Sequence, residues 1–314
     1  MKAAKHTLKG KKRGIYVPEG MITAMVTPFD GAGELDEKAL RKLAEWQIGA
    51  GVDGLMIPGG CGEFVNLNDV ERLKVVEIAV SQAAGRVPVV GGVLATNTRH
   101  ATDLCQRYEG AGASAALVLT PYYVNPSLDG LFRHFETIAQ NTSLPILLYN
   151  NPGRTGIDLG TEILNRLADI PTVVGIKECQ RDIGLVIERM HTVGDRISYL
   201  AGDDDLTIPM FPFGCRGDVG ITNLIAPEPQ VELWAALNRG DWATAVDIHI
   251  NFIMPIFSAV LTKNHPAPMK RMMALAGHPM GDARLPLVAP IADQEAKIKA
   301  TLKAIDRFLK PKKK

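Results

Sequence analysis

The chain has 314 residues, a length that suits one large α/β barrel or two ordinary domains. Its net charge of +1, with 22% charged residues, excludes a strong field of one sign, so we expect neither nucleic acid nor a membrane surface as a partner. No apolar run approaches the length of a bilayer span and no hydrophobic segment follows the basic start, which predicts a cytoplasmic protein.

Short apolar segments recur about every 30 residues, which is the size of one β-strand with its crossover helix. The first is ITAMVTP, after which Asp36 opens a helix with leucines at helical spacing. Eight such units favour a closed (β/α)₈ TIM barrel, because an open doubly wound sheet needs a glycine fingerprint or a switch point that the sequence lacks. The predicted strands lie at 22–28, 54–59, 88–93, 115–120, 145–150, 173–178, 198–203 and 217–222.

From Pro227 onward the strand signals stop and helical patterns follow, at 229–239, 241–258, 266–276 and 292–309. This extension is too small and too apolar to be a separate enzyme, so we expect it to pack on the barrel or on a neighbouring subunit. The predicted organisation is a basic tail at 1–20, a catalytic α/β barrel at 21–235 and a helical C-terminal extension at 236–314.

One predicted strand, VVGIKE at 173–178, places an amine at its end. Its β-branched residues suit a strand buried on both faces, and active sites of such barrels lie at the carboxyl ends of the strands. In an apolar pocket, Lys177 would lose solvation, its pKa would fall, and the neutral amine could attack a carbonyl to form a Schiff base. The alternative is a surface lysine that ends a strand.

A glycine-rich turn, GGCGEF at 59–64, follows the second predicted strand. It leaves the backbone N–H groups of Gly60, Cys61 and Gly62 free to converge on a carboxylate. The alternative is a tight turn without a ligand. The four cysteines are dispersed without a CxxC pair and the seven histidines form no HExxH or similar pair, so we expect free thiols and no metal.

Three further stretches follow strand ends. TPYYVNP holds two tyrosines stiffly between prolines, so that one can face a pocket while Tyr123 points elsewhere, although ordinary packing is the commoner fate of such a pair. In YNNPGRTG, Tyr149 is placed for proton transfer and Arg154 offers a fork for a carboxylate, unless it makes a surface salt bridge. The consecutive aspartates 203–205 cannot all face one ion, which favours helix capping over a metal site.

The motifs GxxGE, TPYY, YNxPxRTG and GIKE, in this order and spacing, resemble the dihydrodipicolinate synthase / N-acetylneuraminate lyase family. The resemblance covers the barrel from Met21 to about Thr222 and extends more weakly through the helical tail. It implies a class I aldolase mechanism on a 2-oxo acid such as pyruvate, with neither a metal nor an organic cofactor. It also implies a homo-oligomer, a dimer of dimers.

The same resemblance implies roles for individual residues. Lys177 matches the Schiff-base lysine and Tyr149 the tyrosine that shuttles protons. Tyr123 matches a tyrosine contributed across a dimer interface, and Arg154 matches the arginine that holds the second substrate's carboxylate. We also expect Val219, on the last predicted strand, to contact the substrate together with Gly60 and Cys61.

The chain departs from the family pattern at the glycine-rich turn. The family's synthases and sialic acid lyases have hydroxyl residues where this chain has Gly60 and Cys61, so the usual proton relay between tyrosines is broken. The positions used for feedback binding of lysine hold other residues, which predicts an enzyme insensitive to lysine; these are Phe64, Val65, Asp69 and Arg72.

Three functions stay open at this stage. The first is a lyase or synthase that makes or breaks a carbon–carbon bond next to a 2-oxo acid. The second is a catabolic dehydratase or deaminase that acts on a 2-oxo acid or cyclic imine acid through the same lysine, and the altered turn favours it somewhat. The third is a 2-oxo acid binding protein without turnover, against which the retention of Lys177, Tyr149, Tyr123 and Arg154 together argues.

Overall fold

The computed structural model describes residues 8–9 and 14–309, so most of the predicted basic tail lies outside the described residues. Within them, eight parallel strands close into a barrel in the order of the sequence, and β8 (Gly217–Gly220) pairs with β1 (Gly20–Ala24). The predicted (β/α)₈ TIM barrel is confirmed, and every predicted strand overlaps an observed one. The remaining strands are β2 (Gly54–Ile57), β3 (Val89–Val93), β4 (Ala115–Leu119), β5 (Ile146–Asn150), β6 (Val173–Glu178) and β7 (Ser198–Ala201).

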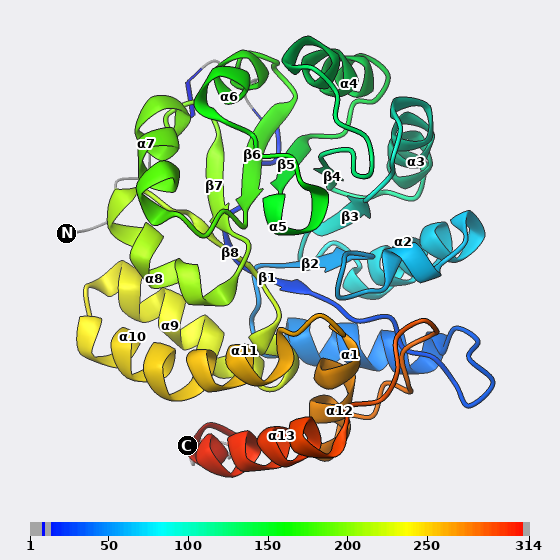
Figure 1. The fold of residues 1–314 in the computed structure, drawn as a ribbon, viewed down its shortest axis with the longest axis vertical. Helices are drawn as coiled ribbons and strands as arrows, with labels where there is room; N and C mark the ends of the chain where they lie inside the picture. Colours follow the sequence, from blue (N-terminus) through cyan, green and yellow to red (C-terminus); the bar gives the residue numbers. More distant parts are fainter. Residues whose placement is uncertain (1–7, 10–13, 310–314) are drawn as a thin grey trace.

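Helices surround the barrel, as Figure 1 shows. Several begin at the side-chain caps that the sequence offers: Asp36 accepts the Ala39 N–H, and Asn68 forms a capping box with Glu71. These caps fix where each helix leaves the strand end before it, and therefore shape the loops at one end of the barrel. The helices up to β8 are α1 (Glu37–Gly49), α2 (Asp69–Ala83), α3 (Thr98–Gly110), α4 (Leu128–Gln140), α5 (Pro152–Thr155), α6 (Thr161–Ala168), α7 (Ile183–Val193) and α8 (Thr207–Met210).

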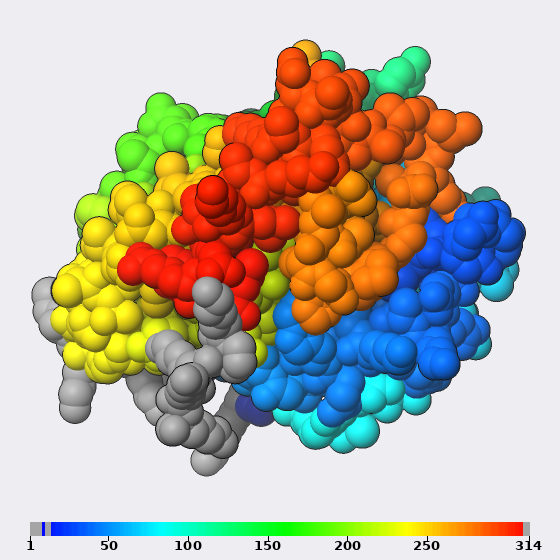
Figure 2. Space-filling view, turned by 90° about the horizontal axis from the view of Figure 1, so that it is seen from below, coloured from blue at the N-terminus to red at the C-terminus, as the bar shows by residue number. Residues whose placement is uncertain are grey.

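The predicted helical extension is present and lies against the barrel. Figure 2 shows the C-terminal segments beside α1 on one face of the molecule, and Trp46 of α1 stacks on His278 with ring centroids 3.9 Å apart. The predicted helix 241–258 contains a π-helical turn, and the predicted helix 292–309 breaks into two. The observed segments are α9 (Pro227–Arg239), α10 (Trp242–Ile248), the π turn His249–Ile253, α11 (Met254–Val260), α12 (Ala267–Leu275), α13 (Ala292–Ala304) and α14 (Asp306–Leu309).

The stretch Trp242–Val260 is one continuous helix of 19 residues, and by length and composition it is apolar enough to cross a bilayer. The expectation that no apolar segment approaches the length of a bilayer span is therefore wrong. Half of the stretch is buried against the rest of the chain, however, which is typical of a core helix in a soluble protein.

The end of the barrel that carries the strand C-termini is closely packed under the glycine-rich turn. A Cβ on Gly92 of β3 would lie 2.0 Å from the Pro58 carbonyl oxygen, so only glycine lets this strand approach the backbone after β2 so closely. The turn that holds Gly60 and Cys61 is thereby seated directly on the barrel rim.

Candidate active site

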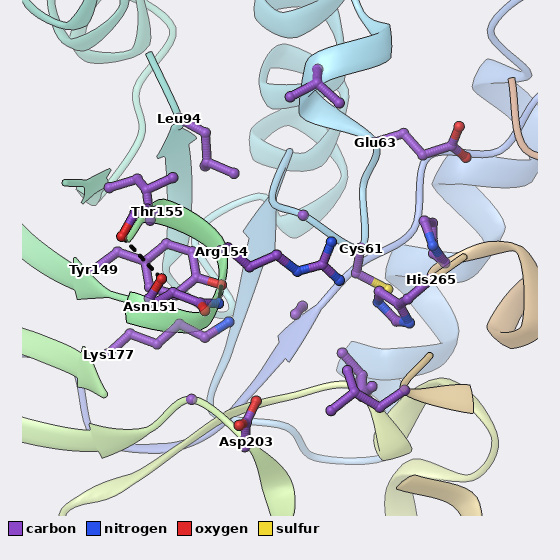
Figure 3. Close-up of a pocket in the computed structure, with 18 of the residues that line it drawn as sticks. Cys61, Glu63, Leu94, Tyr149, Asn151, Arg154, Thr155, Lys177, Asp203 and His265 are labelled. Carbon is purple, nitrogen blue, oxygen red and sulfur yellow. Dashed lines mark hydrogen bonds between the residues drawn. The ribbon is translucent and has the colours of Figure 1, made fainter. Parts of the chain in front are cut away.

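A cavity of about 330 Å³ opens at the carboxyl ends of the strands, where the barrel fold places active sites. Lys177, Tyr149, Arg154, Gly60 and Cys61 all line it, so five of the seven predicted site residues come together in one place. Figure 3 shows Lys177 and Tyr149 entering the cavity from one side.

Lys177 on β6 pairs in register with Tyr149 on β5, and its Nζ lies 4.7 Å from the centre of the tyrosine ring. Its side chain is buried, with the residue 5% exposed. Gly202 makes room for it, because a Cβ there would lie 2.9 Å from Lys177 Cγ. Two strand ends thus hold an amine and a phenol side by side.

The electrostatics of Lys177 differ from the sequence expectation. Burial acts to lower the pKa of the amine, as expected, but the acidic groups around it, first Tyr149 and then Cys179, Asp203 and Asp218, raise it, and the net direction is upward. The predicted fall in pKa is therefore wrong for the resting site. The lysine is an ammonium ion before substrate arrives, and it has to give up a proton before it can attack a carbonyl.

Tyr149 is 7% exposed, and its hydroxyl accepts a hydrogen bond of 3.1 Å from the Asn151 amide. Burial raises the pKa of this phenol, while the charge of Lys177 opposes the rise. The hydroxyl therefore stays protonated at neutral pH, and Tyr149 can donate a proton within the cavity.

The glycine-rich turn presents unused donors. Its backbone hydrogen bonds are donated by Glu63 and Phe64, and no hydrogen bond from the N–H of Gly60 or Cys61 occurs among residues 8–9 and 14–309. A Cβ on Gly60 would meet nothing within 4 Å, so open space lies above it. Burial raises the pKa of the Cys61 thiol to about 12, which keeps it neutral. The turn can hold a carboxylate through its backbone but offers no hydroxyl.

Glu63 anchors this turn in a left-handed conformation with φ of 55°. Its carboxylate is buried and lies 2.7 Å from the ammonium of Lys270 on α12. A non-glycine residue at positive φ is uncommon, and here an ion pair to the C-terminal extension holds it in place.

The remaining predicted residues lie in three different settings. Arg154 on α5 is exposed at the cavity mouth, and its side chain has no ion pair within the part of the chain that the structure describes. Tyr123 is 99% exposed with φ of 74° and does not line the cavity of its own chain, whereas its neighbour Tyr122 does. Val219 is fully buried on β8, and the residues lining the cavity do not include it.

The three consecutive aspartates do not cap a helix together, so that interpretation is wrong. Asp203 and Asp205 pair with Arg181, whereas Asp204 accepts the backbone N–H groups of Ile221 and Thr222. Asp204 thus pins the loop after β8, and Asp203 lines the cavity beside Lys177.

Sequence reasoning missed several polar residues of the cavity, among them Asn66, Lys263 and His265. Lys263 and His265 line it from the segment between α11 and α12, which the sequence analysis treated only as packing material. The available signal was KNHP, a polar stretch set between two apolar helical patterns.

Comparisons with known proteins agree with the fold. A model of the dihydrodipicolinate synthetase family matches residues 17–305. A 4-hydroxy-tetrahydrodipicolinate synthase of Maridesulfovibrio salexigens is 37% identical over 287 residues, which cover 91% of this chain and 98% of that protein. A second enzyme of that name, from Bartonella quintana, is 39% identical over 281 residues, covering 89% and 95%.

Solved structures are similar over the same span. The dihydrodipicolinate synthase of Aquifex aeolicus superposes with a TM-score of 0.89 at 34% identity, covering 94% of this chain and all of that one. The chloride-inhibited enzyme of Acinetobacter baumannii, solved with pyruvate, has a TM-score of 0.88 at 32% identity and covers 92% and 99%.

Proposed function

Because the chain belongs to the dihydrodipicolinate synthetase family and is an enzyme of the class I aldolase type, we propose that Lys177 is the residue that forms its imine with pyruvate or a related 2-oxo acid. The observation that carries the assignment is the pairing of Lys177 with Tyr149 in one cavity, 4.7 Å from Nζ to the ring centre. An amine and a protonated phenol at this spacing supply the nucleophile and the proton donor that imine formation requires.

The steps follow from these two groups. Lys177 first gives a proton to water, and its neutral amine then attacks the carbonyl carbon of the 2-oxo acid. Tyr149 supplies a proton to the departing oxygen, and water leaves. The resulting iminium withdraws electrons, so that the phenolate of Tyr149 can take a proton from C3 and an enamine forms. The enamine carbon then attacks an aldehyde, whose oxygen takes the proton from Tyr149. In the reverse direction this carbon–carbon bond breaks and the aldehyde leaves.

Two cationic or donor regions suit the carboxylates of such reactants. The unused N–H groups of Gly60 and Cys61 are placed to hold the carboxylate of the 2-oxo acid. The exposed guanidinium of Arg154 at the mouth suits a carboxylate on the aldehyde, as in aspartate semialdehyde.

Tyr123 fits a role in a neighbouring subunit. Its side chain is almost fully exposed, its backbone adopts a positive φ that is rare for a bulky residue, and large exposed tyrosines are favoured anchors of interfaces. We therefore assign it to the partner's cavity in a homo-oligomer, a dimer of dimers. The four free, buried cysteines fit a reducing cytoplasmic setting.

The test uses pyruvate alone. In D₂O, the wild-type protein should exchange the methyl protons of pyruvate, and borohydride should trap one pyruvate per chain on Lys177. Lys177→Met should abolish both signals, while Lys299→Met, at an exposed lysine of α13, should leave them unchanged. If the wild type shows neither proton exchange nor an adduct at Lys177, the proposal is wrong.

A second candidate is a dehydratase or deaminase that uses the same imine. The absence of a side chain on Gly60 and the neutral thiol of Cys61 favour it, since the usual hydroxyl relay is missing. Products separate the two functions: an aldehyde and a 2-oxo acid indicate carbon–carbon cleavage, whereas retention of the carbon chain with loss of water or ammonia indicates elimination.

A further inference from the structure

The turn after β2 contains three glycines, and two of them lie in crowded surroundings. A Cβ on Gly59 would lie 2.6 Å from Cε of Met56, so that the methionine would have to move. A Cβ on Gly62 would lie 3.0 Å from the carbonyl oxygen of Met25 and 3.0 Å from the backbone nitrogen of Gly59. The packing of the turn against the barrel therefore accounts for glycine at both positions.

Gly60 lies in different surroundings from the other two. Its backbone does not adopt a positive φ, and a Cβ on it would meet no atom within 4 Å. Neither the backbone conformation nor close packing thus requires a glycine here. Gly60 does line the cavity that holds Lys177. The missing side chain therefore leaves open space beside the cavity, at the turn whose N–H groups suit the substrate carboxylate.

The walls beside this space are apolar. Met56 on β2 lies next to the turn, because its Cε is close to the Cβ position of Gly59, and it lines the cavity. Leu94 follows β3, the strand whose Gly92 lies directly under the turn, and Figure 3 shows it at the cavity wall. Side chains of this kind suit an apolar group of a ligand rather than a charged one.

The covalent structure of a 2-oxo acid relates this space to the reacting atoms. In the proposed function, C2 is bound to Lys177 and the C1 carboxylate lies on the N–H groups of Gly60 and Cys61. C3 is bonded to C2, so it lies about 2.5 Å from C1. A substituent on C3 is therefore only a few bonds from the turn, on the side where the open space lies.

We propose that Gly60 is a specificity-determining residue that admits 2-oxo acids with a small apolar substituent on C3, of which 2-oxobutanoate is the simplest. The inference rests on the proposed function, because it requires the imine at Lys177 and the carboxylate at the turn. Pyruvate leaves the space unfilled, whereas an alkyl group placed there is removed from water. One such substituent leaves hydrogen on C3, so the enamine still forms.

Gly60→Ala is the sharp variant, because it moves one methyl group from the substrate to the protein. Alanine keeps the backbone N–H, needs no positive φ and meets no atom within 4 Å, so the turn should fold as before. The matched control is Gly110→Ala at the end of α3. There a Cβ likewise meets nothing within 4 Å, φ is not positive, and the residue does not line the cavity.

Exchange of C3 protons in D₂O, followed by NMR, compares pyruvate with 2-oxobutanoate for each protein, and borohydride trapping reports the imine. The wild-type protein and Gly110→Ala should exchange the two acids with kcat/KM values within about tenfold of each other. In Gly60→Ala, the ratio of 2-oxobutanoate to pyruvate should fall by about 10 to 200-fold, because the added methyl group excludes its counterpart on the substrate. Pyruvate is the internal reference for each variant.

A wild-type protein that exchanges pyruvate but prefers it by more than about tenfold would overturn the proposal. So would a Gly60→Ala variant that keeps the wild-type ratio, even if both rates fall, because the methyl group would then disturb the imine site or a subunit contact. A wild-type protein that exchanges neither acid instead removes the proposed function itself.

Discussion

Removing the cation of the buried pair between Glu63 and Lys270 should destabilise the protein strongly. The two side chains are 0% and 2% exposed, and Nζ lies 2.7 Å from Oε1. The other carboxylate oxygen of Glu63 accepts the Arg284 backbone N–H and the Asn66 amide. Lys270→Met keeps the length of the side chain but leaves the Oε1 side of a buried carboxylate without a cation.

Breaking a buried pair from one side costs about 3–5 kcal/mol. At about 2–4 °C per kcal/mol for a large domain, the melting temperature should fall by about 6–20 °C. Because Glu63 also anchors the turn of Gly60 and Cys61, the KM for pyruvate should rise as well.

The matched control is Lys9→Met, since Lys9 pairs with Asp195 at 2.9 Å while both side chains are exposed. Such surface pairs contribute about 0–1 kcal/mol. Thermal and urea unfolding, followed by circular dichroism, compare the two variants. Equal losses of stability would refute the reasoning, as would a double variant Glu63→Gln, Lys270→Met no more stable than the single one, because the double variant buries no charge.

Three other predictions follow from the site and the core. Mixed dimers of inactive Tyr123→Phe and inactive Lys177→Ala chains should regain part of the activity, because Tyr123 is exposed in its own chain; no recovery in verified mixed dimers would place it elsewhere. Free L-lysine should leave the initial rate unchanged, since the positions that the family resemblance assigns to lysine binding include Phe64 and Arg72, whose guanidinium lies 4.0 Å over the phenyl ring; inhibition would contradict this. Burial lowers the pKa of His134 to about 4, so between its ordinary value and 4 the unfolded chain binds more protons, and the free energy of unfolding falls as the pH is lowered. His134→Gln should lessen that fall when unfolding is measured at several pH values, and an unchanged slope would count against the prediction.

The barrel and the neighbouring positions of Lys177 and Tyr149 in the cavity could be predicted because their signals are local. Buried parallel strands are continuous apolar runs at a regular interval, and a polar residue at the end of such a run must lie at the barrel rim. Lys177 and Tyr149 are of this kind, and β5 and β6 bring them into register as neighbours. The residues of the GGCGEF turn follow by the same reasoning.

What failed depends on contacts between distant segments. The direction of the Lys177 pKa is set partly by Asp203 and Asp218, which β7 and β8 bring close, and a single strand shows only its burial. Arg181 forms ion pairs with two of the three consecutive aspartates, Asp203 and Asp205, so the local preference of aspartate for helix caps did not decide their roles. Helical periodicity after Pro227 likewise says nothing of which turn between helices enters the barrel mouth.

The positions of Lys263 and His265 imply a division of roles between the two parts of the chain. In the proposed function the strand ends supply the groups that act on the 2-oxo acid, and the segment between α11 and α12 lines the same cavity from outside the sheet. Lys177 and Tyr149 lie on paired strands, so their relative position is set by the register of the barrel. The segment that carries Lys263 and His265 lies outside the sheet and is free of that constraint, so substitutions in it can change the second reactant while imine formation is preserved.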